Sequence, residues 1–379
     1  METIGVDPVG VRLMSPKFFH YNLKLPGLFS AEANIIKQDA LSLGAEAAIA
    51  KGVVSCEVET SGVIVSGTEK QLMRLAEKLR FQPYRLRDAA DSIEEALGNL
   101  VKKDFVWRCR ERELRLCGRT LVMGILNLTA DSFYPAGRCL TVDTAVKRAF
   151  EMRGDGADII DVGGESTRPG ARPVETDEEI SRVAPVISAL AKEGFFISVD
   201  TMKAEVARAA LEAGASIIND VSGLGDPLMA EVLAIYRAGV VIMHMRGVPD
   251  SMQKDICYGD MMAEIFGYLA QRVEYAVSSG IDMESIAIDP GIGFGKSREG
   301  NLEILRRLRE FTTLGRPLLV GVSRKSFIGH DASERLPGTL ASVASAVLSG
   351  ARIVRVHDVK ETMLALEVVD NIRGEGKGG

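Results

Sequence analysis

Residues 121–372 alternate short apolar runs with amphipathic stretches, and this alternation constrains the fold more than any other feature of the sequence. The apolar runs are rich in valine and isoleucine, as expected of strands that are covered on both faces. The eight runs are 121–127, 157–164, 195–200, 216–220, 239–245, 285–291, 317–324 and 352–358. The stretches with helical periodicity are 142–154, 176–193, 204–213, 227–238, 261–279, 302–314, 340–348 and 359–372.

Eight strand–helix pairs over about 250 residues have the length of a (β/α)8 TIM barrel. An open, doubly wound sheet is the competing architecture, and it requires a glycine-rich turn after the first strand. Residues 127–132 follow that strand here and read NLTADS, which contains no glycine. The sequence therefore predicts an α/β fold that closes into a barrel.

The first hundred residues have a different pattern, typical of a smaller α+β domain. We predict strands at 23–27, 47–54 and 56–66 and a short run at 83–86, with helices at 31–43 and 69–80. Residues 91–103 are predicted to form a linking helix that starts at an Asp-Ser cap, and 107–116 a hairpin that closes the barrel bottom. The predicted domains are 1–104, of unknown role, and 105–379. Charges within 32–37 and 69–78 are expected on solvated helix faces.

Composition excludes several classes of partner and site. The net charge of −6 argues against a nucleic-acid or anionic-membrane surface. No apolar run approaches the roughly 18 residues of a membrane span, and the start of the chain lacks a secretory h-region. Five cysteines without a C-x-x-C pair predict reduced thiols, and four scattered histidines argue against a zinc site. We expect a cytoplasmic protein.

Polar residues end all eight apolar runs. One such residue is more often a helix cap or a turn former than a functional group. Eight on one rim predict a polar pocket at the carboxyl ends of the strands, where barrel enzymes have their active sites. His244 follows the fifth run, where a buried structural role is the expected one.

Seven short motifs then occur in order at spacings that suit a barrel. They are MGILN at 123–127 with DSF at 131–133, GGESTRPG at 163–170, SVDT at 198–201, ND at 219–220, DPGIGFGK at 289–296, SRKS at 323–326 and RVHD at 355–358. Over residues 107–372 the chain thereby resembles the dihydropteroate synthase family. The resemblance implies a folate-biosynthesis transferase that condenses 4-aminobenzoate with 6-hydroxymethyl-7,8-dihydropterin diphosphate and releases pyrophosphate. It also implies Mg²⁺ as cofactor and a homodimer.

The resemblance assigns a role to each matching residue. Asp200, Asn219 and Asp289 would hold the pterin, since a carboxylate can accept from a ring N–H and an exocyclic amine together. The expected catalytic residues are Asp200, Asp289, Lys325 and Arg355.

Other residues are implied for the diphosphate and the arylamine. Asn127, Arg355 and His357 would bind the diphosphate, and Asn127 would also be a ligand of Mg²⁺. Lys325 would contact the pterin and line the arylamine site, which the loop residues Thr167 and Arg168 would complete. Ser326 and Phe294 are expected at the arylamine as a hydrogen-bond donor and an aromatic wall.

The first loop departs from the family pattern T-P-D-S-F-S-D-G-G. Residues 129–137 read TADSFYPAG, with Ala130 in place of proline and Tyr134-Pro135-Ala136 in place of the acidic turn. Alanine leaves the backbone freer than proline, which fixes φ. The arylamine assignment is therefore less constrained than the pterin assignment.

Two other functions remain open at this point. A methyltetrahydrofolate–corrinoid methyltransferase would share the pterin contacts but needs no diphosphate or arylamine site, and GGESTRPG, SRKS and RVHD argue against it. A non-catalytic pterin-binding subunit is suggested by the altered first loop and the additional N-terminal domain. Binding of pterin diphosphate without product formation would identify the second.

Overall fold

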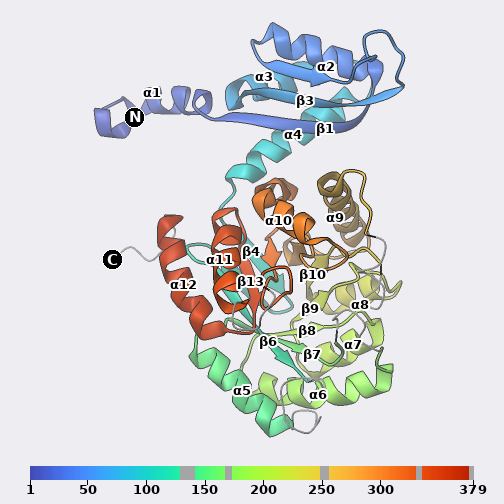
Figure 1. Cartoon of the computed structure of the whole chain (residues 1–379), viewed down its shortest axis with the longest axis vertical. Coiled ribbons are helices and arrows are strands. Elements are labelled where there is room, and N and C mark those ends of the chain that lie inside the picture. Colours follow the sequence, from blue (N-terminus) through green and yellow to red (C-terminus); the bar gives the residue numbers. More distant parts are fainter. Residues whose placement is uncertain (129–140, 167–172, 248–255, 330–334, 375–379) are drawn as a thin grey trace. The chain divides into compact units, whose positions relative to one another are not determined.

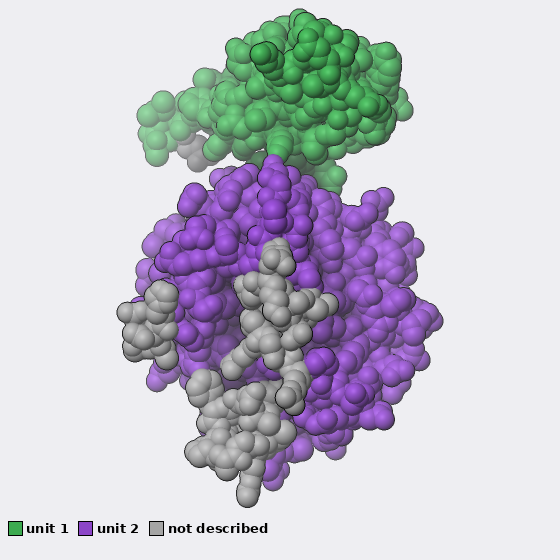
Figure 2. Space-filling view, turned by 45° about the vertical axis from the view of Figure 1, so that its right-hand side comes forward, with its two compact units in different colours: residues 1–102 green, residues 103–379 purple. Residues whose placement is uncertain are grey.

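The computed structural model describes residues 1–128, 141–166, 173–247, 256–329 and 335–374 (Figure 1). The chain forms two compact units, residues 1–102 and 103–379, which are coloured separately in Figure 2. None of the helices in these ranges combines the length and apolar character that a bilayer crossing requires.

The second unit contains a parallel eight-stranded barrel, so the predicted fold class is confirmed. The strand order is β11-β10-β9-β8-β7-β6-β13-β12, and a parallel bridge between Ile288 and Leu318 joins the two ends. The strands are β6 (Leu121–Asn127), β7 (Ile159–Gly163), β8 (Ile197–Asp200), β9 (Ile217–Asp220), β10 (Gly239–Met243), β11 (Ile286–Asp289), β12 (Leu319–Val320) and β13 (Ile353–Val356).

Helices follow the strands and form the outer layer of the barrel (Figure 1). The prediction of one helix over 302–314 is wrong. The Ser297 side chain caps a helix that starts at Arg298, and a separate 3-10 helix, η4, spans Leu308–Leu314. The helices are α5 (Val142–Gly154), α6 (Thr176–Lys192), α7 (Ala204–Ala213), α8 (Met229–Tyr236), α9 (Met261–Ser278), α10 (Arg298–Arg306), α11 (Arg335–Leu348) and α12 (Val359–Ile372).

The barrel interior is apolar toward the amino ends of the strands. Alternate residues of each strand point inward, and those of the lower layers form one buried cluster with the hairpin that precedes the barrel. This hairpin, β4 (Phe105–Cys109) and β5 (Arg112–Leu116), was predicted to close the barrel bottom. Trp107 is fully buried there, and its indole Nε1 donates to the Ser285 carbonyl at 2.8 Å. The barrel strands contribute Leu121, Met123, Ile159, Ile217, Val241, Ala287, Leu319 and Ile353 to the cluster, which Phe196, directly before β8, also joins.

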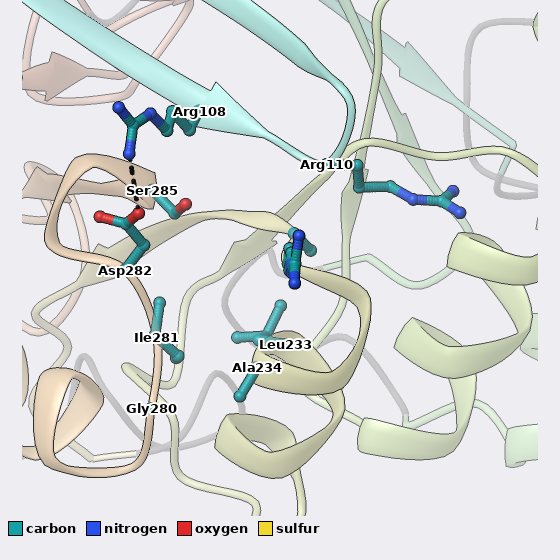
Figure 3. A pocket seen from close by; sticks show the side chains of 10 residues that line it. Arg108, Arg110, Leu233, Ala234, Gly280, Ile281, Asp282 and Ser285 are labelled. Carbon is teal, nitrogen blue, oxygen red and sulfur yellow. Dashed lines mark hydrogen bonds and ion pairs between the residues drawn. The ribbon is translucent and has the colours of Figure 1, made fainter.

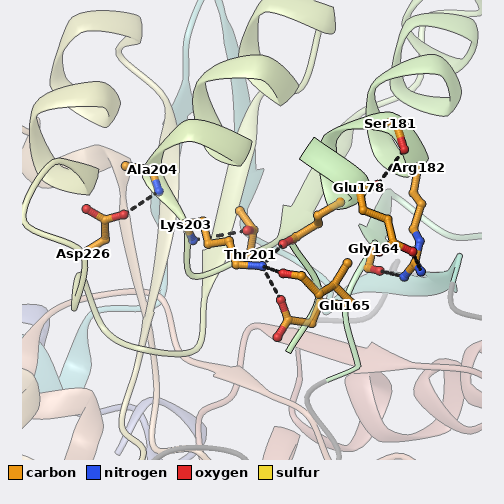
Figure 4. Close-up of polar contacts among 11 residues, drawn as sticks. Gly164, Glu165, Glu178, Ser181, Arg182, Thr201, Lys203, Ala204 and Asp226 are labelled. Atoms are coloured by element: carbon orange, nitrogen blue, oxygen red, sulfur yellow. Dashed lines mark hydrogen bonds and ion pairs between the residues drawn. The ribbon is translucent and has the colours of Figure 1, made fainter. Parts of the chain in front are cut away.

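A half-buried ammonium joins three segments near the carboxyl ends of β7 and β8. Lys203 Nζ donates to Glu165 Oε2 at 2.6 Å, to Glu179 Oε2 at 2.7 Å and to the Val174 carbonyl at 2.6 Å. Figure 4 shows Lys203 directed at Glu165. Burial raises the pKa of Glu179, although the ammonium beside it acts in the opposite direction. Lys203 therefore fixes the chain on both sides of residues 167–172.

The first unit is a three-stranded antiparallel sheet of order β1-β3-β2 whose alternate residues pack on helices. It begins with a short helix, α1, that the sequence did not predict. The elements are η1 (Glu2–Ile4), α1 (Pro8–Met14), η2 (Ser15–Lys17), β1 (His20–Phe29), α2 (Ser30–Ser42), β2 (Glu46–Ile49), β3 (Thr60–Thr68), α3 (Glu69–Leu79) and α4 (Leu86–Val101).

Two predictions for this unit are wrong around residue 86. Residues 83–86 form no strand, because Tyr84 has a left-handed φ of 64° in a turn. The helix predicted over 91–103 is α4, and it begins at Leu86 without a side-chain cap. Ser92 lies inside it and donates to the Asp88 carbonyl. A buried apolar stripe that starts at Leu86, five residues before the apparent cap, sets the start of the helix.

Glu32 corrects the expectation of a solvated face over 32–37. The Glu32 side chain is 1% exposed. Its Oε2 accepts from the Phe29 backbone N–H at 2.9 Å, and its Oε1 accepts from that of Arg85 at 3.3 Å. One carboxylate therefore satisfies the start of α2 and the residue that precedes α4.

Trp107→Ala should lower the free energy of unfolding by about 3–5 kcal/mol, because the variant loses a large buried side chain and leaves a cavity in the barrel base. Urea unfolding followed by far-UV circular dichroism measures this loss. Leu364 is 62% exposed, so Leu364→Ala is the control and should change stability by about 0.5 kcal/mol or less. A loss below about 1 kcal/mol for Trp107→Ala would contradict the role of the hairpin as a packed plug.

Lys203→Met should destabilise the protein by about 3–5 kcal/mol, because it leaves the buried Glu179 and the partly buried Glu165 without their cation. The same urea titration measures the effect, with the exposed Lys192→Met as the matched control. Equal stability of the two variants would show that the ion cluster contributes nothing to the fold.

Candidate active site

The predicted pterin residues lie at inward-facing positions near the carboxyl ends of the strands. Asp200 ends β8, Asn219 lies beside it on β9, and Asp289 ends β11. Their exposures are 5%, 3% and 6%, so all three polar side chains are buried. Because parallel strands present the same end to one rim, the apolar lower layers of the barrel give way here to a polar layer.

Arg355 connects this layer across the barrel. It points inward from β13, where its Nη2 donates to Asp200 Oδ2 at 2.7 Å and its Nε donates to Asp161 Oδ2 at 2.6 Å. Asp161, on β7, has no exposed surface and also accepts from Asn219 Nδ2 at 3.2 Å. Arg355 Nη1 makes no hydrogen bond within the described parts of the chain. One guanidinium thus links two buried carboxylates and keeps an N–H group for a ligand.

Asp200 is poised between its charged and neutral forms. Burial raises the pKa of Asp200 to about 7, the Arg355 guanidinium acts against this rise, and the charge of Asp161 adds to it. Asp200 Oδ1 is buried and has no hydrogen-bond partner among the described residues. A buried acceptor of this kind suits the N–H groups of a bound heterocycle.

Lys325, Asp289 and Phe294 form the opposite side of the site. Lys325 Nζ donates to the Ile292 carbonyl and lies 4.4 Å from the centre of the Phe294 ring. Burial lowers the pKa of Lys325 to about 8, against the influence of the Asp289 carboxylate. Gly293 has φ +87°, and a Cβ there would lie 2.6 Å from Lys325 Cδ. Glycine at this position therefore lets the lysine cross the loop into the site.

The predicted diphosphate residues lie on neighbouring strands. His357 Nδ1 is 3.0 Å from Ser323 Oγ, which fixes the imidazole beside Arg355. Asn127 ends β6 and is half-buried. Its Oδ1 lies 3.3 Å from where a Cβ on Gly163 would stand, so the glycine leaves room for the amide. Ser326 is exposed in the turn after Lys325.

Several predicted residues cannot be located in this geometry. Thr167 and Arg168 lie outside the described residues, as do the departures of the first loop, Ala130 and 134–136. Their roles stay predictions.

Two charged residues of this region were missed from the sequence. The sequence prediction covered residues at strand ends, whereas Asp161 lies within β7. A single carboxylate inside the apolar run IIDVG was a usable signal, since buried charges need a partner. Lys203 gave no such signal, because its partners come from three different segments.

His244 is buried, as predicted. Its Nδ1 lies 3.1 Å from the buried Lys296 Nζ, and burial lowers the pKa of His244 to about 3. Lys296 Nζ also donates to the carbonyls of Gly291 and Phe294, both at 2.8 Å. The pair therefore shapes the loop that presents Phe294 to the site.

A cavity of about 450 Å³ lies at the other end of the barrel (Figure 3). Its lining residues include Ala238 and Ser285, which precede β10 and β11. Arg108 in its wall is paired with Asp282 and Glu284, at 3.1 and 2.9 Å, and Arg110 donates to the carbonyls of Leu211 and Ala215. Arg108 is thus ion-paired, and Arg110 is bound to main-chain carbonyls. Because barrel enzymes have their active sites at the carboxyl ends of the strands, the polar layer there is the stronger candidate for catalysis.

Some known proteins match about two thirds of the chain, and others match nearly all of it. Residues 123–357 match the family model of pterin binding enzymes. Dihydropteroate synthase of Escherichia coli is 48% identical over 254 residues, which cover 66% of this chain and 90% of that protein. A crystal structure of Xanthomonas albilineans dihydropteroate synthase with 4-aminobenzoic acid has a TM-score of 0.67 and 42% identity, and the match covers 71% of this chain and 98% of that one.

A longer relative matches the first unit as well. The probable bifunctional folylpolyglutamate synthase/dihydropteroate synthase of Halobacterium salinarum is 42% identical over 381 residues, or 98% of this chain. The chain spans 45% of that protein, less than half of its length. The match to the family model, residues 123–357, runs from β6 to the end of β13 and so contains the strands that carry the polar rim. The chain belongs to the dihydropteroate synthase family of pterin binding enzymes.

Proposed function

We propose that this chain is a dihydropteroate synthase, which condenses 4-aminobenzoate with 6-hydroxymethyl-7,8-dihydropterin diphosphate to give 7,8-dihydropteroate and pyrophosphate. The observation that carries this proposal is the polar layer of Asp200, Asn219, Asp289, Lys325 and Arg355 in one barrel mouth. Its two pterin-edge carboxylates are buried, and one of them, Asp200, keeps an oxygen without a hydrogen-bond partner among the residues that the structure describes.

The pterin would lie against the floor of this layer. Asp200 and Asp289 would accept from its ring N–H and amino groups, and the Asn219 amide would meet complementary atoms at its edge. Lys325 would donate to the acceptor side of the ring. The Asn219 Nδ2 group already donates to Asp161, which leaves its carbonyl oxygen for the ligand.

The diphosphate would lie beside β6 and β13. Arg355 Nη1 and His357 would donate to its oxygens, and Asn127 would contribute its amide oxygen to Mg²⁺. No cluster of three or more acidic, histidine or cysteine side chains arranged for a metal occurs among the described residues. A single amide oxygen combined with phosphate oxygens is a donor set that Mg²⁺ accepts, so the residues fit the ion. When bound, Mg²⁺ would neutralise charge on the departing diphosphate.

The arylamine would lie on the Lys325 side of the site. Phe294 would flank its ring, Ser326 would donate to its carboxylate, and Thr167 and Arg168 would complete the site. The chain's own residues favour cleavage of the C–O bond before the C–N bond is complete. Asp200 and Asp289 would stabilise positive charge on the pterin and its exocyclic carbon, while Arg355 and His357 would hold the pyrophosphate. The amine then forms the new bond and loses a proton.

Pyrophosphate release tests the proposal directly. The purified chain should release pyrophosphate only when pterin diphosphate, 4-aminobenzoate and Mg²⁺ are all present. Binding of the pterin diphosphate without release would favour a non-catalytic subunit, and methyl transfer from methyltetrahydrofolate to a corrinoid would favour the methyltransferase alternative. We also propose that the chain forms a homodimer, as the family resemblance implies, and sedimentation of the same sample tests this. The role of residues 1–104 is not assigned by this proposal.

The pH dependence should report Asp200. Since its pKa is raised to about 7, the carboxylate is protonated at lower pH and cannot stabilise a cation. We expect kcat/KM for the pterin diphosphate to rise between about pH 6 and pH 8. Asp200→Asn should lower kcat/KM by roughly 100-fold or more and abolish this rise. The exposed Asp143→Asn is the matched control. An unchanged profile in Asp200→Asn would remove Asp200 from the mechanism.

Asn127 should govern the response to Mg²⁺. Chelation by EDTA should stop turnover of the wild type, and added MgCl₂ should restore it. Asn127→Ala removes the amide oxygen and should raise the Mg²⁺ concentration needed for half-maximal rate by roughly tenfold. Asn371→Ala, on α12, is the control and should follow the wild-type titration. A wild-type titration curve for Asn127→Ala would contradict the assignment of this ligand.

A further inference from the structure

We propose that Asp161 is a positioning residue of this site, which orients Arg355 and Asn219 from below the polar layer and balances the Arg355 charge together with Asp200. The role of Asp161 in catalysis rests on the proposed function. The contacts that Asp161 makes are observed among the described residues, whatever the reaction is.

Asp161 lies deeper in the barrel than the residues that would touch a ligand. On β7 its Cα pairs with Ile125 of β6 and Ser198 of β8, whereas Asp200 pairs with Gly163, two residues nearer the rim. Asp161 and Ser198 have no exposed surface. The carboxylate is therefore placed under the polar layer.

One oxygen of Asp161 fixes two neighbours. Asp161 Oδ2 accepts from Arg355 Nε at 2.6 Å and from Asn219 Nδ2 at 3.2 Å. The Nε and Nη2 groups lie on one edge of the Arg355 guanidinium, and this edge faces Asp161 and Asp200. The remaining Nη1 group is left for a ligand. The Asn219 amide then directs its nitrogen toward Asp161 and its carbonyl oxygen away from Asp161. Among the described residues, the hydrogen bond to Asp161 is the contact that selects this amide orientation.

The arrangement is costly for stability, which argues against a purely structural role. A buried carboxylate is destabilising unless its hydrogen bonds are satisfied, and a well-packed apolar residue is often as good or better. Asp161 Oδ1 is buried without a hydrogen-bond partner in the described structure. Asp161 and Asp200 share the single positive charge of Arg355, which leaves an excess of negative charge in this part of the barrel. In the proposed reaction, positive charge develops at the same place.

The charge of Asp161 also acts on Asp200. Burial raises the pKa of Asp200 most, and Arg355 lowers it. Removal of the Asp161 charge should therefore make Asp200 easier to ionise. The charged groups that face Asp200 are Asp161 on β7, Glu179 on α6, Asp220 on β9, Arg355 on β13 and Lys325 after β12.

Asp161→Asn separates charge from shape, because the asparagine carbonyl can still accept a hydrogen bond at the same place. The probe is 6-hydroxymethylpterin, whose binding to the full chain is followed by its fluorescence from pH 5 to pH 9. We expect roughly tenfold weaker binding than in the wild type and a pH midpoint lower by roughly one unit. Where turnover is measured, KM for the pterin diphosphate should rise more than kcat falls. An acid without influence on the site would change neither the affinity nor the midpoint.

Ser198→Ala is the matched control, since it removes a polar group at the same depth without changing charge. It should keep the wild-type affinity within about twofold and the wild-type midpoint. If Asp161→Asn does not fold, as judged by circular dichroism, Asp161→Ser, which leaves space for water, replaces it with the same expected results. A folded Asp161 variant with wild-type affinity and midpoint overturns the proposal.

The binding assay also separates this inference from the proposed function. If the wild type binds the pterin but releases no pyrophosphate, the proposed synthase activity is wrong. The pterin affinities and pH midpoints of the Asp161 variants then still decide whether Asp161 is a positioning residue. A wild type that binds no pterin overturns both.

Discussion

The polar end of the barrel depends on one guanidinium held between two buried carboxylates. Arg355 reaches from β13 to Asp200 on β8 and Asp161 on β7 and so joins the last strand to residues that lie 155 and 194 positions earlier in the chain. An uncompensated charge at this depth would be strongly unfavourable, and the ion network makes the polar layer possible. The low exposure of this layer also raises the pKa of Asp200, because burial disfavours the charged carboxylate and outweighs the opposite effect of Arg355.

The layers below supply the setting for this network. Inward-facing residues of the lower strands and of the β4–β5 hairpin form an apolar cluster that fills the barrel. Water is thereby kept from the underside of Asp161, and hydrogen bonds in the upper layer gain strength in a medium of low polarity. The loops are anchored separately: Lys203 holds Glu165 and Val174, and Lys296 holds Gly291 and Phe294. Two lysines thus fix the positions of loop segments that the geometry of the strands alone would not determine.

Much of the barrel was predictable, because each strand and helix has its own hydrophobic period. The predicted bounds of β6, α5, α7 and α12 agree with those observed. Rim residues such as Asp200 and Asn219 were also found, since parallel strands bring their ends together whatever their order. Asp161 was not found, because it lies inside β7 rather than at its end, although a carboxylate within the apolar run IIDVG was a usable signal. Glu32 was misjudged for another reason: it has the spacing of a surface charge, and its burial depends on Phe29 and Arg85 meeting in space. The errors near Leu86 came from reading Asp91-Ser92 as a cap when an apolar stripe sets the helix start.

The closed base of the barrel has a consequence for how the molecule assembles during translation. The β4–β5 hairpin leaves the ribosome before any barrel strand, yet Trp107 bonds to Ser285, 178 residues later. Its apolar face also packs on Ile353 of the last strand. For most of synthesis, therefore, this hairpin has an uncovered hydrophobic side that chaperones can hold. Completion of the barrel is what hides it.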